Sequence, residues 1–119
     1  MKIPGPDHPI TITPAGTAVV VKAGGTGLAD TTDALTLKEA SYPAVQYLPR
    51  SGVDMSRLVR TERSTHCPYK GDASYYSIRN ADGGLIENAV WSYETPFPAV
   101  AAIREHLAFY PDKVEIAVG

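Results

Sequence analysis

The stretch ASYYSIRNADGGLIENAVWSY, residues 73–93, reads as two β-strands joined by a tight turn. Both arms are rich in aromatic and β-branched residues, which favour strands, and ADGG between them is typical of a hairpin turn. Side chains two positions apart on a strand share a face, so we expect Trp91 and Tyr93 on the same side of the sheet. This hairpin predicts a fold that is mainly β.

The rest of the chain supports the same fold class, because ten glycines and ten prolines punctuate it at short intervals. Alternating or β-branched runs predict further strands at residues 10–13, 17–22, 35–38, 44–49 and 114–118. The second and third of these look like the arms of a hairpin or meander. Residues 51–58 predict a short helix or 3₁₀ turn, and residues 98–106 predict the main helix, with Val100 and Ile103 three apart.

Length and charge limit the function classes. The 119 residues fit a single domain, 1–119, in which residues 1–9 form an N-terminal arm. The net charge of −2 leaves no basic excess for a phosphate backbone, so we expect no nucleic-acid partner. Because no apolar run approaches ~20 residues and no signal-peptide core is visible, we expect a cytoplasmic chain without a membrane partner. The sequence leaves a homo-oligomer open.

The stretch STHCPYKGDASYY, residues 64–76, contains the only cysteine and is either a reactive site or a turn leading into a strand. The Cys67 thiol becomes a nucleophile when nearby positive charge stabilises its thiolate, and His66 is a candidate general base. The alternative is a partly buried cysteine that packs as a small apolar side chain. One cysteine and three scattered histidines form no recognisable ligand pattern, so we expect no metal and no cofactor.

The run AGGTGLA, residues 23–29, brings three glycines together and admits two interpretations. A phosphate-binding loop needs a strand before it and a helix after it, but the residues that follow read as a strand. We therefore expect Gly24 and Gly25 to form a tight turn that uses the access of glycine to positive φ.

Aromatic and basic residues form a more suggestive set, many of them near the predicted strand ends: Tyr47, Arg50, Lys70, Tyr75, Tyr76, Trp91, Tyr93 and Tyr110. Rings in strands usually pack a core, which is the alternative to a binding role. Arg50 and Lys70 each lie near a proline and a strand end, where loops often build binding sites. We expect the two cations to reach one rim and to hold an anionic, planar small molecule there.

Four motifs, VQYLPR, STHCPYKGDASYY, NAVWSYETP and LAFYPDKV, occur in this order, and together they resemble the domain of unknown function 427 family, which is also labelled nucleotidyltransferase-like. The resemblance covers about residues 18–116. It implies a compact, single-domain antiparallel sheet, tent-like or a partly open barrel, with one or two short helices. It also adds Thr65 of the TxCPYKG run to the ligand-binding candidates. It implies no established reaction, and no zinc is carried over because the chain has no CxxC pair.

Two hypotheses follow. The first is a domain that binds an anionic or planar small molecule through the ligand-binding candidates above. The second is an enzyme in which Cys67 or His66 acts with Lys70 or Arg50, or a nucleotidyltransferase-like activity. The acidic residues do not favour the transferase, because Asp30 and Asp33 are three apart and no D-x-D pair is present.

Overall fold

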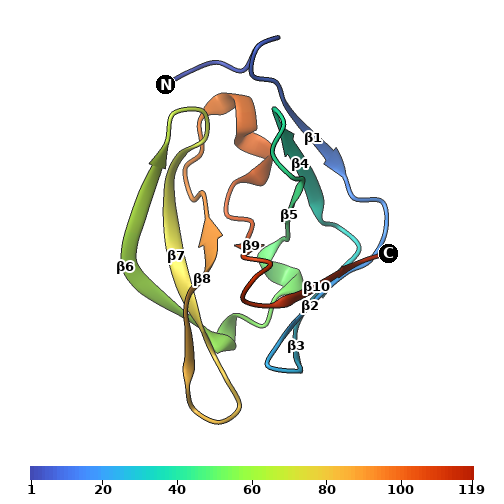
Figure 1. The fold of residues 1–119 in the computed structure, drawn as a ribbon, viewed down its shortest axis with the longest axis vertical. Coiled ribbons are helices and arrows are strands. Elements are labelled where there is room, and N and C mark those ends of the chain that lie inside the picture. The colour runs from blue at the N-terminus through green and yellow to red at the C-terminus, as the bar shows by residue number, and fades with distance from the viewer.

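The computed structural model describes residues 1–119. It is mainly β, as expected, and its ten strands form three antiparallel sheets. The first sheet has the order β1-β4-β5: Ile10–Pro14, Leu35–Glu39 and Val45–Tyr47. The second has the order β10-β2-β3: Glu115–Val118, Val19–Ala23 and Thr26–Thr31. The third has the order β6-β7-β8-β9: Leu58–Cys67, Gly71–Arg79, Leu85–Ser92 and Ala108–Phe109. In Figure 1 the third sheet stands on one side of the molecule and the other two on the opposite side.

The hairpin predicted at residues 73–93 is β7–β8, and its strands lie within two residues of the expected bounds. Tyr75 lies directly opposite Trp91 in this ladder, and Ser74 lies opposite Ser92. Because successive residues of a strand face opposite ways, β7 contributes to two separate cores. Tyr76 and Ile78 belong to the larger core, whereas Ala73 and Tyr75 belong to the smaller one.

Two expectations about the other strands are corrected. The strand at 17–22 does not pair with the strand at 35–38, because β2 pairs with β3 and β10 while β4 pairs with β1 and β5. Gly24 and Gly25, at φ +59° and +78°, make the tight turn between β2 and β3, as expected of them. The ten-residue strand β6 was not predicted from the sequence. It lies at an edge of its sheet and none of its side chains is buried, so its sequence does not alternate between apolar and polar residues.

The helices are all short and of the 3₁₀ type. Two of them, Arg50–Gly52 and Met55–Arg57, confirm the short helix or 3₁₀ turn expected at residues 51–58, and the first begins one residue before that range. The expected main helix at 98–106 is instead a 3₁₀ segment, Pro98–Ile103, broken at Val100, where φ is −122°. The spacing of three between the buried Val100 and Ile103 fits three residues per turn as well as it fits an α-helix. No helix in the structure has the length and hydropathy needed to cross a bilayer.

The N-terminal arm lies against the turn between β6 and β7 (Figure 1). The Lys2 amide donates a 2.8 Å hydrogen bond to the Pro68 carbonyl oxygen. The His8 ring stacks on Tyr69, with centroids 4.0 Å apart and an angle of 7° between the planes. These contacts bring the arm to the turn that carries Lys70.

Gly71 begins β7 at a φ of +110°, a backbone conformation that residues with a Cβ rarely adopt. We predict that Gly71→Ala lowers the free energy of unfolding by about 1–3 kcal/mol, measured by urea denaturation, because alanine is strained there. The space around the site is not the cause, since an added Cβ would meet its nearest neighbour, the Thr95 carbonyl oxygen, at an ordinary 3.6 Å.

Gly27→Ala is the matched control, because Gly27 has no positive φ and an added Cβ there meets nothing within 4 Å. It should change the free energy of unfolding by no more than about 0.5 kcal/mol. Equal stability of the two variants would show that the conformation of Gly71 is not required by the turn.

Candidate functional site

The turn between β6 and β7 directs Lys70 toward the β1-β4-β5 sheet. Cys67 pairs with Gly71 at the end of the ladder, which leaves Pro68, Tyr69 and Lys70 as the loop. The Lys70 carbonyl oxygen accepts a hydrogen bond from the Phe97 amide, 3.0 Å away, which fixes the end of the turn. Lys70 is only 8% exposed, so its ammonium group points inward and does not stand at an open rim.

The Lys70 ammonium donates to the Glu39 carboxylate at the end of β4. The second Glu39 oxygen lies 2.7 Å from Nε2 of His8 in the N-terminal arm. The Glu39 side chain is 14% exposed. Burial raises the pKa of Glu39, but the hydrogen bonds with Lys70 and His8 outweigh it, so the net pKa lies below its ordinary value of 4.5. Glu39 is therefore an ionised partner for the Lys70 ammonium and a hydrogen-bond partner of the His8 ring.

Aromatic side chains pack beside this ion pair. The Trp91 indole Nε1–H donates to the Tyr47 hydroxyl at 3.3 Å, and the two rings meet edge to face. The Tyr110 ring lies 4.6 Å from the Trp91 ring and stacks at 6.5 Å on the Tyr75 ring. Burial raises the pKa of the Tyr47 and Tyr93 hydroxyls far above the ordinary value, so both stay neutral.

The ion pair and the rings line a partly open pocket of about 230 Å³, which we call the aromatic pocket. Its walls come from β4, β5, β7 and β8 and from the loops beside them. The lining residues are Leu37, Glu39, Tyr42, Pro43, Val45, Tyr47, Lys70, Tyr75, Trp91, Tyr93 and Tyr110. Five of the seven ligand-binding candidates are thus brought together: Tyr47, Lys70, Trp91, Tyr93 and Tyr110.

Thr65 does not line the pocket, but it contacts Tyr75, which does. Its hydroxyl lies 2.9 Å from the Tyr75 hydroxyl, which in turn lies 3.3 Å from the Tyr110 hydroxyl. Burial raises the pKa of Tyr75, but hydrogen bonds with Thr65, Tyr110 and Arg63 outweigh it and leave the pKa lowered. Burial and the bond to Tyr75 raise the pKa of Tyr110 to about 12.

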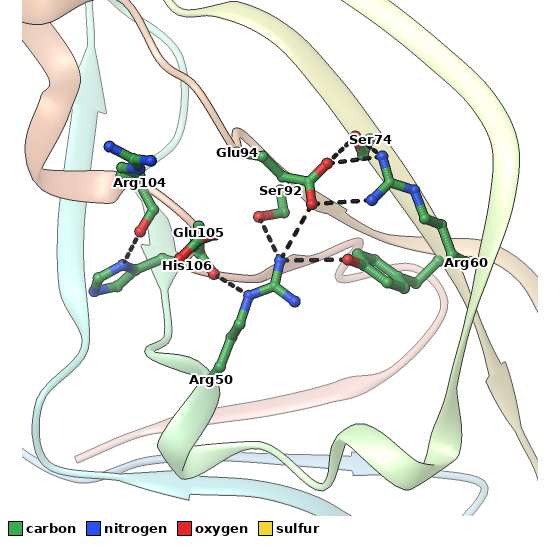
Figure 2. A network of polar contacts seen from close by, with 9 residues as sticks. Arg50, Arg60, Ser74, Ser92, Glu94, Arg104, Glu105 and His106 are labelled. Atoms are coloured by element: carbon green, nitrogen blue, oxygen red, sulfur yellow. Dashed lines mark hydrogen bonds and ion pairs between the residues drawn. The ribbon is translucent and has the colours of Figure 1, made fainter.

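Arg50 is placed elsewhere, and its expected convergence with Lys70 is not found. Figure 2 shows its guanidinium in a separate polar network, where Nε donates to the Glu105 carbonyl oxygen at 2.8 Å and Nη2 contacts Ser92 at 3.5 Å. Nη2 also donates to the Tyr76 hydroxyl at 3.3 Å. Ser92 and Tyr76 lie on the face of β7–β8 opposite Trp91 and Tyr75, so the sheet itself separates Arg50 from the aromatic pocket.

Arg50 and Lys70 each have a carboxylate partner of their own within the protein. Glu94 lies 3.9 Å from Nη2 of Arg50 and makes two closer contacts with Arg60, at 2.7 and 2.9 Å (Figure 2). Burial raises the pKa of Glu94, but the bonds from Arg60 and Ser74 outweigh it and hold the pKa low. Glu39 forms the corresponding ion pair with Lys70. The two cations therefore need no shared anion between them.

The candidate catalytic residues Cys67 and His66 are neighbours on β6 and face opposite ways. His66 is exposed, and its Nδ1 lies 2.7 Å from the Asp72 carboxylate, its cross-strand partner. Cys67 is half-buried and packs against the smaller core. No hydrogen bond joins the two side chains. No three His, Cys, Asp or Glu side chains gather closely enough to hold a metal ion together.

Sequence reasoning missed Glu39 and Tyr42 as residues of the site, and it noted Tyr75 among the aromatic residues without making it a ligand-binding candidate. One signal for Glu39 was available, because Leu35, Leu37 and Glu39 alternate and so share a face of β4. A carboxylate on the same strand face as buried apolar residues is itself partly buried, so it needs a cation or a hydrogen-bond donor as a partner. Nothing in the sequence names that partner, since Lys70 is 31 residues away along the chain.

A family model matches most of the chain. The model of the family described as Domain of unknown function (DUF427), which also carries a nucleotidyltransferase label, matches residues 11–119. No curated protein matches the sequence. The match spans every strand of the three sheets except the first residue of β1, and it includes all residues that line the aromatic pocket. The chain belongs to the family of the domain of unknown function 427.

Proposed function

We propose that this protein binds a small planar molecule in the aromatic pocket and that the Lys70–Glu39 pair contacts the polar end of that molecule. The observation that carries this proposal is a buried ion pair in the wall of an otherwise largely aromatic cavity. Burying two charges costs free energy, and replacing a buried ion pair with well-packed apolar residues often leaves a protein equally or more stable. Stability alone therefore does not explain the Lys70–Glu39 pair. Polar groups at a concave apolar surface fix the orientation of a ligand and give specificity.

The size of the aromatic pocket limits the ligand. Drug-sized ligands occupy cavities of about 300–1,000 Å³, whereas an apolar cavity of about 150 Å³ admits benzene. At about 230 Å³ the aromatic pocket fits a single ring with a small substituent. Flat ligands suit its walls, because aromatic rings prefer offset or edge-to-face contacts.

The charges around the aromatic pocket favour a negative group on the ligand. Lys70 and Glu39 are the two charged residues in its wall, and their charges cancel. The Arg63 guanidinium lies 4.9 Å from the centroid of the Tyr75 ring and adds a positive charge nearby. A carboxylate on the ligand is the simplest group that accepts from the Lys70 ammonium and lies in this field.

Trp91 is the only tryptophan of the chain and lines the aromatic pocket, so its fluorescence reports binding directly. We predict that benzoate changes the Trp91 emission with a saturable dependence on concentration. The neutral isostere benzamide should bind more weakly. The double variant Lys70→Met with Glu39→Gln should weaken benzoate binding about tenfold, because a hydrogen bond from a charged donor is lost.

The double variant removes both charges together, so no unpaired charge remains buried. Lys113→Met is the control, because Lys113 is exposed, lies outside the aromatic pocket and donates to the Glu87 carbonyl oxygen. Its benzoate affinity should equal that of the unmodified protein. The absence of saturable binding, or equal affinity in the double variant, would contradict the proposal.

The ionised Glu39 should make stability depend on pH. A carboxyl whose folded pKa is depressed contributes stability that is present above its unfolded pKa and lost as pH falls through the folded value. We predict that Glu39→Gln destabilises the protein at pH 7 and that the difference from the unmodified protein shrinks below about pH 4.5. Urea denaturation between pH 3 and pH 7 measures this difference.

Glu62→Gln is the matched control for that series, because Glu62 is exposed on β6 and makes no ion pair. Its difference from the unmodified protein should stay near zero at every pH. A constant difference for Glu39→Gln down to pH 3 would mean that the ionised form of Glu39 is not the stabilising one.

A further inference from the structure

The aromatic pocket has a second polar group besides the Lys70–Glu39 pair. The hydroxyls of Thr65, Tyr75 and Tyr110 form a chain with contacts of 2.9 and 3.3 Å. Three hydroxyls carry three protons, and the two contacts use two of them. Neither Thr65 nor Tyr110 makes another side-chain hydrogen bond, so both can donate to the Tyr75 oxygen, and the Tyr75 proton is then left for an acceptor in the aromatic pocket.

The hydroxyl chain and Lys70 enter the aromatic pocket from separate points along β7. Lys70 immediately precedes the strand, and Tyr75 is five residues further on, so the two side chains come from different positions along β7. Tyr75 is opposite Trp91 in the ladder, so its hydroxyl belongs to the wall built on the tryptophan. A ligand in the aromatic pocket therefore meets polar groups from two different places.

Arg63 makes Tyr75 the stronger hydrogen-bond donor of the tyrosine pair. Its guanidinium lies 4.9 Å from the centroid of the Tyr75 ring, on the edge strand β6. A cation over the ring withdraws charge from it and favours the release of its proton. Burial raises the pKa of Tyr75, but hydrogen bonds with Thr65 and Tyr110, and after them the Arg63 guanidinium, leave that pKa lowered, whereas burial and the bond to Tyr75 raise the pKa of Tyr110.

We propose that the ligand is a single flat ring with a polar group at each end, one bound by Lys70 and the other accepting a hydrogen bond from the Tyr75–Tyr110 hydroxyl chain. This inference rests on the proposed function of the aromatic pocket and adds the ligand class to it. Tyr75 is then the residue that distinguishes a hydroxyl-bearing ring from an apolar ring of the same size. Ring-substituted benzoic acids with the substituent opposite the carboxylate are the matching chemical class.

The experiment compares 4-hydroxybenzoate with 4-methylbenzoate, whose methyl group is close in size to a hydroxyl but makes no hydrogen bond. Isothermal titration calorimetry of the full chain should give about tenfold tighter binding of the hydroxy acid. Tyr75→Phe should reduce this ratio to near one by weakening the binding of 4-hydroxybenzoate, because phenylalanine keeps the ring but has no hydroxyl to donate. Tyr76→Phe is the matched control, because its hydroxyl contacts Arg50 on the opposite face, and it should keep the full ratio.

The outcomes separate the two proposals. If both acids bind but the unmodified protein does not prefer the hydroxy acid, or Tyr75→Phe keeps the preference, the hydroxyl chain does not contact the ligand. That result overturns the inference and leaves the aromatic pocket as a binding site. If neither acid binds to protein that is folded by circular dichroism, both proposals fail.

Discussion

Successive side chains of β7 point to opposite faces of its sheet, and this alternation divides the molecule into two environments. On one face Tyr76 contacts Arg50 within a polar network that also contains Ser92 and Glu94. On the other face Tyr75 joins the smaller core and the aromatic pocket. One residue of register would exchange the two faces, so the pairing of β7 with β8 fixes which groups can meet a common ligand.

The Lys70–Glu39 pair joins the third sheet to the first, since it connects the turn before β7 with the end of β4. His8 of the N-terminal arm contacts the same carboxylate, so three separate parts of the chain meet at one buried charge. Removing a single partner would leave the other charged and buried, which is costly. This constraint explains why the pair holds Lys70 toward the aromatic pocket and not toward solvent. It also supplies the polar end of a site whose other walls are mainly rings and aliphatic side chains.

Local patterns in the sequence correctly predicted the fold class, the β7–β8 hairpin and the turn at Gly24 and Gly25. They failed for β6, because an edge strand with no buried side chain lacks the apolar alternation that marks other strands. They also failed for the partners of charged side chains. Arg50 and Lys70 have similar local sequences, each near a proline and a strand end. In the structure Arg50 pairs with Glu94 and Lys70 pairs with Glu39, and both partners are distant in sequence. The aromatic candidates did converge on one cavity, since strand periodicity limits where rings on paired strands can lie.

The central claim is that the aromatic pocket is a binding site, and the indole N–H of Trp91 tests it most directly. It is the only indole N–H of the chain, and it donates to the Tyr47 hydroxyl in the wall of the aromatic pocket. In a titration with benzoate followed by nitrogen–proton correlation NMR, the account predicts that the indole signal and the Gly71 amide signal shift together and saturate at one concentration. The Gly27 amide, in the second sheet, should stay in place. Saturating shifts confined to the face that carries Arg50 and Arg60, with the indole signal unmoved, would contradict the account.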